Sequence, residues 1–162
     1  MPLSTNLRNR ILNAIVGRDS AFGSTVYLGL SSTPLNEDGS GITEPSGNGY
    51  TRVLVGSYSQ SYTQKFTAAA NGAVTNAEDI YFPESTGGWG EPLTHFFLST
   101  SKTGTSASSI LAFDVLQADG VAAPVTVTTE KTVVMFRKGQ LIIKYTDASI
   151  IDEIAELIGG DE

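Results

Sequence analysis

The sequence of 162 residues contains no cysteine and only one histidine, His95. The absence of cysteine excludes disulfide bonds, thiol nucleophiles and every cysteine-based zinc or iron–sulfur site. A metal site would need carboxylates with at most one imidazole, and a Ser-His-Asp hydrolase could use only His95 as its base. We therefore expect a protein that is not an enzyme and that has no metal or other cofactor.

Charged residues are also scarce, at 17% of the chain against about 25% in an average globular domain. The formal net charge is -7, and six acidic residues lie within residues 146–162, which contain no lysine or arginine. The rest of the chain is therefore nearly neutral. We expect no nucleic-acid partner, because such a partner requires clustered basic residues. No uncharged apolar run reaches the ~18 residues of a membrane-spanning helix, so no membrane partner is expected either.

The N-terminal segment predicts a short amphipathic helix. Ser4 or Thr5 can cap it, because a hydroxyl oxygen accepts hydrogen bonds from the first free backbone amides. Its apolar positions recur every four residues, and they are Leu7, Ile11 and Ile15. The same segment carries Arg8 and Arg10, and Arg18 follows them. One apolar face of this helix must therefore pack against something.

The C-terminal segment predicts a second short helix, which is acidic. Thr146 or Asp147 can cap it, and its apolar positions are Ile150, Ile151, Ile154, Leu157 and Ile158. Burial of one such side chain is worth about 1.5–3 kcal/mol, so this face will not stay in water. It packs either on its own domain or on a neighbouring protein, and the sequence leaves both open. The interaction surface expected here consists of the apolar positions of both helices.

Between the helices the apolar pattern has a period of two, which predicts strands. One run begins at Thr25, and the later ones are residues 50–57, 73–76, 79–82, 93–100, 109–115, 123–128, 132–136 and 140–145. A hairpin turn is predicted at Lys138-Gly139, between the last two runs. Short strands without intervening helices predict an all-β fold, namely an antiparallel, jelly-roll-like β-sandwich. The expected division is residues 1–24 (helix and lead-in), 25–145 (sandwich) and 146–162 (acidic helix).

The strand pattern also predicts which side chains form the core. The expected core residues are Val26, Leu28, Val53, Val55, Phe82, Phe96, Leu98, Leu111, Phe113, Val134, Phe136, Ile142 and Tyr145. A register error of one residue would move every side chain of a strand to its other face.

Candidate chemical groups each have a simpler structural interpretation. His95 lies in a predicted strand and is expected to be bonded within the sheet. The acids Glu78, Asp79, Glu84 and Glu91 could supply a glycosidase pair, which needs two carboxylates across a sugar-binding cleft. Trp89 could stack on a sugar, although a lone tryptophan between glycines more often fills the end of a core. Residues 36–41 lack the acid spacing of a calcium loop. The long loop 31–49 is either functional or a plain surface connection.

Two motifs carry a resemblance to a known family. Residues 46–52 read Ser-Gly-Asn-Gly-Tyr-Thr-Arg, and residues 82–90 read Phe-Pro-Glu-Ser-Thr-Gly-Gly-Trp-Gly. With the leading helix, Asn76 and the strand around His95, they make the chain resemble a family of small β-sandwich proteins of tailed bacteriophages, the tail fibre or minor virion proteins. The resemblance covers about residues 4 to 145, and the acidic C-terminal helix falls outside it. It implies a structural role without a catalytic or cofactor site.

This resemblance implies a non-enzymatic virion component in the tail, baseplate or fibre-attachment region. A capsid decoration or head-fibre protein is the alternative, and a carbohydrate-binding module that uses Trp89 and loop 31–49 is a further one. The implied partners are other virion proteins and further copies of the chain, with a trimer favoured by analogy. A host surface glycan is a weaker candidate. Assembly in the reducing cytoplasm of the bacterial host would agree with the absence of cysteine.

Overall fold

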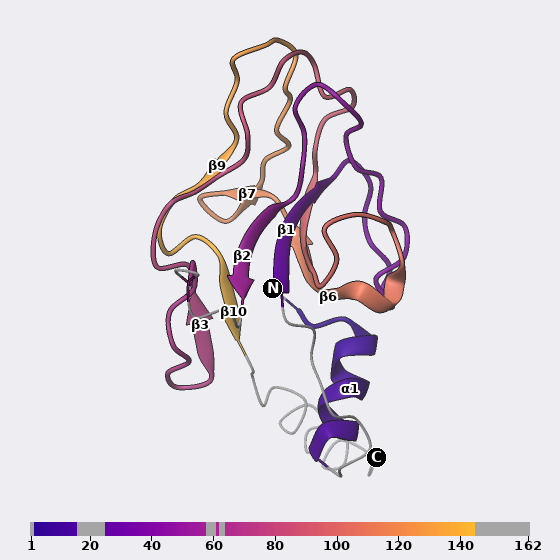
Figure 1. The fold of residues 1–162 in the computed structure, drawn as a ribbon, viewed down its shortest axis with the longest axis vertical. Coiled ribbons are helices and arrows are strands. Elements are labelled where there is room, and N and C mark those ends of the chain that lie inside the picture. The colour runs from indigo at the N-terminus through magenta and orange to yellow at the C-terminus, as the bar shows by residue number, and fades with distance from the viewer. Residues whose placement is uncertain (1, 16–24, 58–60, 62–63, 145–162) are drawn as a thin grey trace, which may run out of the picture.

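The computed structural model describes residues 2–15, 25–57, 61 and 64–144, which are mostly strands and loops (Figure 1). The elements are α1 (Thr5–Ile15), β1 (Thr25–Ser31), β2 (Val53–Ser57), β3 (Ala73–Thr75), β4 (Ile80–Tyr81), β5 (His95–Ser99), the 3₁₀ turn η1 (Ala107–Ser109), β6 (Ile110–Val115), β7 (Gln117–Ala118), β8 (Val121–Ala122), β9 (Met135–Phe136) and β10 (Ile142–Lys144). Every pairing between these strands is antiparallel. The all-β, antiparallel class is therefore confirmed, while the jelly-roll-like sandwich stays a prediction.

The largest sheet has four strands in the order β2-β1-β5-β6 (Figure 1). Its inner strands are β1 and β5, and the last four residues of each are buried. Three separate pairs of strands complete the described fold: β10-β3, β4-β9 and β7-β8. The inner strands of this sheet are thus covered on both faces. A strict alternation of apolar and polar residues would instead leave one face of each strand exposed.

The two faces of this sheet belong to different apolar clusters. Leu28, Leu30, Phe96 and Leu98 belong to the larger cluster, which also contains residues from β2, β4, β9 and several loops. Phe97 belongs to a smaller cluster, together with Ile110, Leu35 and the half-buried Ile42 and Phe113. Neighbouring residues of a strand point to opposite faces, so Phe96 and Phe97 enter different clusters.

Most of the predicted core residues are indeed buried. The buried ones are Leu28, Val55, Phe82, Phe96, Leu98, Val134 and Phe136. Four others are half-buried against a cluster, namely Val26, Val53, Leu111 and Phe113. The prediction for Ile142 is wrong, because its side chain is 40% exposed on β10, a strand that pairs only with β3. Tyr145 lies outside the described residues.

The strand predictions hold except near the C-terminal end of the described chain. Residues 123–128 contain no strand, only an isolated bridge between Val125 and Leu93, and Pro124 lacks the amide that a ladder needs. The hairpin β7-β8 just before them was not predicted. A turn does form at Lys138-Gly139, where Gly139 has a φ of 82°. It does not join a hairpin, because β9 pairs with β4 and β10 pairs with β3.

The predicted N-terminal helix is present as α1. Ser4 is its cap, since the amide of Leu7 donates a hydrogen bond to Ser4 Oγ at 3.2 Å. α1 packs beside β6 at the lower end of the molecule (Figure 1). The predicted helix within residues 146–162 lies outside the described residues.

Candidate functional site

The two motifs that carry the family resemblance lie against each other. The Trp89 indole donates a hydrogen bond to the carbonyl oxygen of Asn48 at 2.9 Å, and the amide of Thr86 donates to the same oxygen at 3.0 Å. In return, the Asn48 side-chain amide donates to the Gly88 carbonyl. Side-chain and backbone donors thereby hold residues 46–52 and 82–90 together through backbone carbonyl oxygens, which makes their junction a structural feature.

Aromatic packing reinforces this junction. Tyr50 stacks on Phe82 with 6.1 Å between ring centroids, and it meets Trp89 edge-on at 5.3 Å. Trp89 is only 4% exposed. Both its ring and its N–H are occupied inside the protein, so Trp89 fills the end of a core and offers no free face to a sugar.

A buried ion pair completes the first motif. The Arg52 guanidinium binds both carboxylate oxygens of Glu44, at 2.9 and 2.6 Å, and Arg52 is only 4% exposed. It also donates to the carbonyl oxygens of Ser101 and Gly104, at 2.8 and 2.6 Å. The Tyr50 hydroxyl donates to Glu44 at 2.7 Å. Burial and the Glu44 carboxylate raise the pKa of this phenol, so Tyr50 remains a protonated donor.

The long loop 31–49 folds over the sheet. Its Leu35 and Ile42 pack in the smaller cluster with Phe97 and Ile110. A Cβ added at Gly39 of this loop, where φ is 90°, would lie 2.7 Å from Ile110 Cβ. The loop is therefore part of the packing, and the carbohydrate-binding interpretation loses both of the features on which it was based.

The other candidate groups have local structural roles. His95 Nδ1 lies 2.8 Å from Thr94 Oγ1, within hydrogen-bond distance. Burial lowers the pKa of the His95 imidazole, and the nearby Asp114 carboxylate opposes this shift without cancelling it. Residues 36–41 form a turn in which the amide of Ser40 donates to Asp38 Oδ1 at 2.8 Å. Hydrogen bonding from Ser40, first from its side chain and second from this amide, lowers the pKa of the Asp38 carboxyl.

The four acids of the glycosidase interpretation show no catalytic arrangement. Glu78 pairs with Lys65, and Asp79 accepts a hydrogen bond from the Lys138 amide. Glu84 and Glu91 are exposed. Within the described ranges, no group of three or more acidic or histidine side chains is placed to hold a metal ion.

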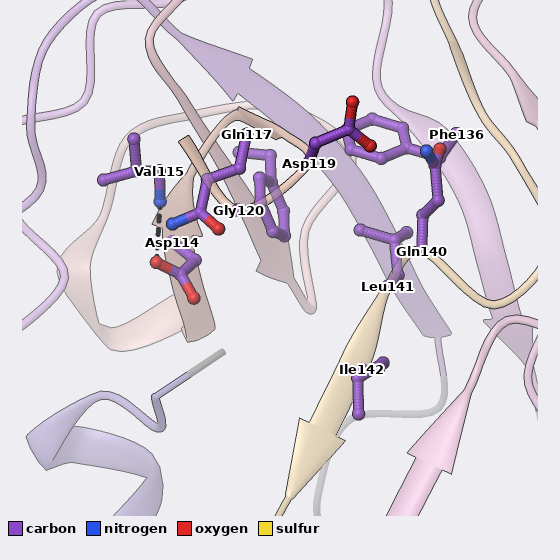
Figure 2. Close-up of a pocket in the computed structure, with 10 residues that line it drawn as sticks. Asp114, Val115, Gln117, Asp119, Gly120, Phe136, Gln140, Leu141 and Ile142 are labelled. Carbon is purple, nitrogen blue, oxygen red and sulfur yellow. Dashed lines mark hydrogen bonds between the residues drawn. The ribbon is translucent and has the colours of Figure 1, made fainter. Parts of the chain in front are cut away.

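A pocket of about 310 Å³ opens elsewhere on the surface (Figure 2). Its lining includes Gln117 and Asp119 from the β7-β8 hairpin, and Gln140 and Ile142 from β10 and the segment that leads into it (Figure 2). Asp114 also belongs to its wall. Its polar groups can exchange hydrogen bonds with a ligand. Its aromatic lining consists of Phe96 and Phe136, each only 8% exposed, so stacking on a sugar ring is not available there.

Sequence reasoning missed this pocket because its lining comes from separate segments whose pairing was not foreseen. The β7-β8 hairpin brings Asp119 and Gly120 to the pocket, and both have positive φ angles of 52° and 80°. The Asp-Gly pair at this turn was the available signal, because it is typical of two-residue hairpin loops.

The predicted interaction residues fall into two groups. Leu7 and Ile11 lie on α1 and are half-buried. The backbone of Ile15 ends the helix, while its side chain lies outside the described part. The remaining members also lie outside it, and they are Ile150, Ile151, Ile154, Leu157 and Ile158. The shared interaction surface of the two helices therefore stays a prediction.

The segment before α1 is held on the edge of the sheet, and the sequence did not predict this. The amide of Ser4 donates to the Leu111 carbonyl at 2.9 Å, and the Phe113 amide donates to the Pro2 carbonyl at 3.3 Å. Leu3 thereby forms an antiparallel bridge with Ala112 of β6. The edge of β6 is occupied by the N-terminal segment as by a short additional strand.

Comparisons with known proteins agree with the resemblance. In the described part of the chain, no helix is long and apolar enough to cross a membrane. No curated protein matches the sequence. A protein-family model does match it over residues 2–143, and its description is Podophage GP4 fiber I protein gp80. This match covers most of the chain, including both motifs and the paired edge of β6, and the chain therefore belongs to this family of phage fibre proteins.

Proposed function

We propose that the chain is a non-enzymatic structural component of a tailed phage particle, located in the tail, baseplate or fibre-attachment region. The family match supports a virion component that contacts other virion proteins. Among the candidate catalytic groups, Trp89 and Asp79 are engaged in packing or local hydrogen bonds. These features suit a rigid domain that connects proteins rather than one that turns over a substrate.

One observation carries the proposed mode of attachment. No described side chain of α1 belongs to either apolar cluster, and none of these side chains is buried. Its apolar residues Leu7 and Ile11 are only half-buried, so each keeps an accessible part that a neighbouring protein could cover. The terminal segments, residues 1–24 and 146–162, are the proposed attachment elements on either side of the β domain.

The aliphatic residues of the C-terminal segment would supply affinity, and its acids would supply orientation. Exposed ion pairs are worth only about 0–1 kcal/mol each, whereas buried isoleucines contribute more. The arginines of the N-terminal segment have the opposite sign to the six acids near the C-terminus. An arrangement in which the two segments of neighbouring copies meet would build a homo-oligomer, with a trimer expected by analogy.

Deletion of residues 147–162 tests this mode of attachment. We expect the shortened chain to keep its melting temperature and to lose oligomer mass in light scattering. Two full-length variants separate the contributions. The apolar variant combines Ile150→Ser, Ile154→Ser and Leu157→Ser, and it removes apolar area. The charge variant combines Asp152→Asn, Glu153→Gln and Glu156→Gln, and it removes only charge.

The apolar variant should assemble poorly, and the charge variant should still assemble with a weaker salt dependence. A large fall in melting temperature with unchanged oligomer mass would show that the segment serves its own domain. Electron microscopy of intact particles with a label on this chain tests the location, and a label on the head would favour a decoration or head-fibre protein instead.

A further inference from the structure

The N-terminal arm, residues 2–11, is attached to the body through one edge. Its hydrogen bonds to the sheet run from residues 2–4 to β6, where the Ser4 hydroxyl also donates to the Ile110 carbonyl at 2.7 Å. Two further bonds join it to loops: Thr5 N to the Glu37 carbonyl at 2.9 Å, and Asn6 Nδ2 to the Ser108 carbonyl at 2.7 Å. In all of these bonds the partner atom on the body belongs to the backbone.

The arm extends the sheet in the same way as a strand added to an exposed edge. β6 is the last strand of the order β2-β1-β5-β6, and among the described residues the arm is what pairs with the outer edge formed by Leu111 and Phe113. An uncovered edge strand readily accepts a strand from another chain. The edge of β6 therefore recognises backbone groups of the arm. The arm of a second copy carries the same groups and would pair with this edge equally well.

The burial of the arm is uneven. Ser4 is fully buried at the point where the strand-like part becomes the helix. The described side chains of α1 beyond it are half-buried or exposed, and the helix packs mainly on β6. The arm is thus anchored by the short strand, while its helix lies on the outside of the domain.

We propose that the edge of β6 is an assembly site at which the arm of one copy pairs with β6 of a neighbouring copy. This inference rests on the proposed function, because it names a second copy of the chain as a partner. Exchange of the arm keeps all of the hydrogen bonds between arm and body, but now they join the arm of one subunit to the body of the next. Nine residues separate the end of α1 from the start of β1 in the sequence, so the ten steps from Ile15 to Thr25 span at most about 36 Å when fully extended.

The absence of cysteine permits a direct test by crosslinking. Leu3 and Ala112 face each other in the antiparallel bridge, and the bonds flanking them make this a non-hydrogen-bonded pair. The Cα atoms of such a pair lie about 4.5 Å apart, within the range of a disulfide. Full-length Leu3→Cys and Ala112→Cys chains, of which one carries a size tag, are co-expressed, purified and oxidised.

A disulfide-linked heterodimer on a non-reducing gel is the expected result, because each chain carries only one of the two cysteines. The double variant Leu3→Cys/Ala112→Cys should then give crosslinked multimers. If the mixed single variants give no heterodimer while the double variant closes fully within one chain, the arm stays on its own domain and the inference is overturned. The control Gln117→Cys/Ala122→Cys, within the β7-β8 hairpin, should close within one chain in every case.

A second pair keeps the test decisive if cysteine at the buried position 112 prevents folding. Asn6 is half-buried and Ser108 is exposed, and a hydrogen bond joins them. Asn6→Cys and Ser108→Cys chains joined by a short bis-maleimide should report the same connection. Light scattering shows whether copies assemble, whereas crosslinking shows which copy supplies the arm. An oligomer with only intramolecular crosslinks would overturn this inference and leave the proposed function standing.

Discussion

The ring of Phe97 lies directly over Gly29, its partner on the neighbouring strand. A Cβ added to Gly29 would lie 2.3 Å from the ring atom Cζ. Arg52 lies above the same ring, with its guanidinium carbon 4.8 Å from the ring centroid. The ring therefore lies between Gly29 and the Arg52 guanidinium, and any side chain at position 29 would clash with it.

Substitution Gly29→Ala should destabilise the fold by about 3 kcal/mol, because overpacking a rigid core site costs about 1–3 kcal/mol or more. Urea denaturation measures the loss. Gly56→Ala is the matched control in the same sheet, where the added Cβ would lie 3.4 Å from its nearest neighbour. The double variant Gly29→Ala/Phe97→Leu should lose less than the sum of the single variants, and strict additivity would contradict the steric explanation.

The ion pair of Arg52 and Glu44 should behave as a buried pair. Arg52→Met should cost about 3–5 kcal/mol, because it leaves the Glu44 carboxylate unpaired next to Tyr50. Arg52→Lys should also destabilise the fold, since an ammonium cannot reproduce the two-point contact. The double variant Arg52→Met/Glu44→Leu should recover part of the loss in urea denaturation. If the double variant is no more stable than Arg52→Met alone, the unpaired Glu44 carboxylate is not the cause of the lost stability.

Asn76 should be a second sensitive position. Its side chain accepts a hydrogen bond from Leu141 N at 2.9 Å and donates to the carbonyls of Glu78 and Arg137 at 2.8 and 2.9 Å. An unsatisfied buried group costs about 1–3 kcal/mol, so Asn76→Ala should lose at least about 2 kcal/mol in thermal or urea unfolding. The exposed Asn36 is the control, and its replacement by alanine should cost under about 1 kcal/mol.

The single histidine should make stability depend weakly on pH. Burial lowers the pKa of His95 in the folded state, so the unfolded chain binds more protons near and below its ordinary pKa of about 6.5. Stability attributable to His95 should therefore fall as the pH decreases through this value. The urea midpoint of the wild type, compared with that of His95→Gln between about pH 5 and pH 8, measures this difference. If the wild type instead gained stability relative to His95→Gln as the pH decreased, burial of His95 would not be the cause of the pH dependence.

Much of the secondary structure could be predicted from periodicity, because buried strands and the capped helix leave local signals. Ser4 shows this most clearly, since a hydroxyl just before an apolar period of four marks a helix start. The pairing of strands could not be predicted in the same way. Lys138-Gly139 does form a turn, yet the strands on either side pair with β4 and β3. Partner choice depends on contacts between distant segments, such as those of Asn76 with residues 137–141.

The candidate site illustrates the same limit. Residues 46–52 and 82–90 were recognisable as motifs, but their mutual contact is made by Asn48 and Gly88 through backbone oxygens that no sequence pattern reveals. The pairing of Leu3 with Ala112 spans more than a hundred residues and involves no distinctive side chain. Backbone recognition between distant segments leaves little trace in composition.

The junction of the two motifs has a consequence for how the sequence can drift over evolutionary time. Its hydrogen bonds all end on backbone carbonyl oxygens, which every residue carries, but two of the donors are the side chains of Trp89 and Asn48. The junction therefore constrains backbone shape throughout and side-chain identity only at these two positions. Gly49 has a φ of 81°, and an added Cβ there would lie 2.8 Å from the Glu84 carbonyl oxygen. We expect related chains to vary freely at exposed positions such as Ser46 and Thr51 and to retain Gly49 and Trp89. Variable and invariant positions should therefore alternate within a few neighbouring residues.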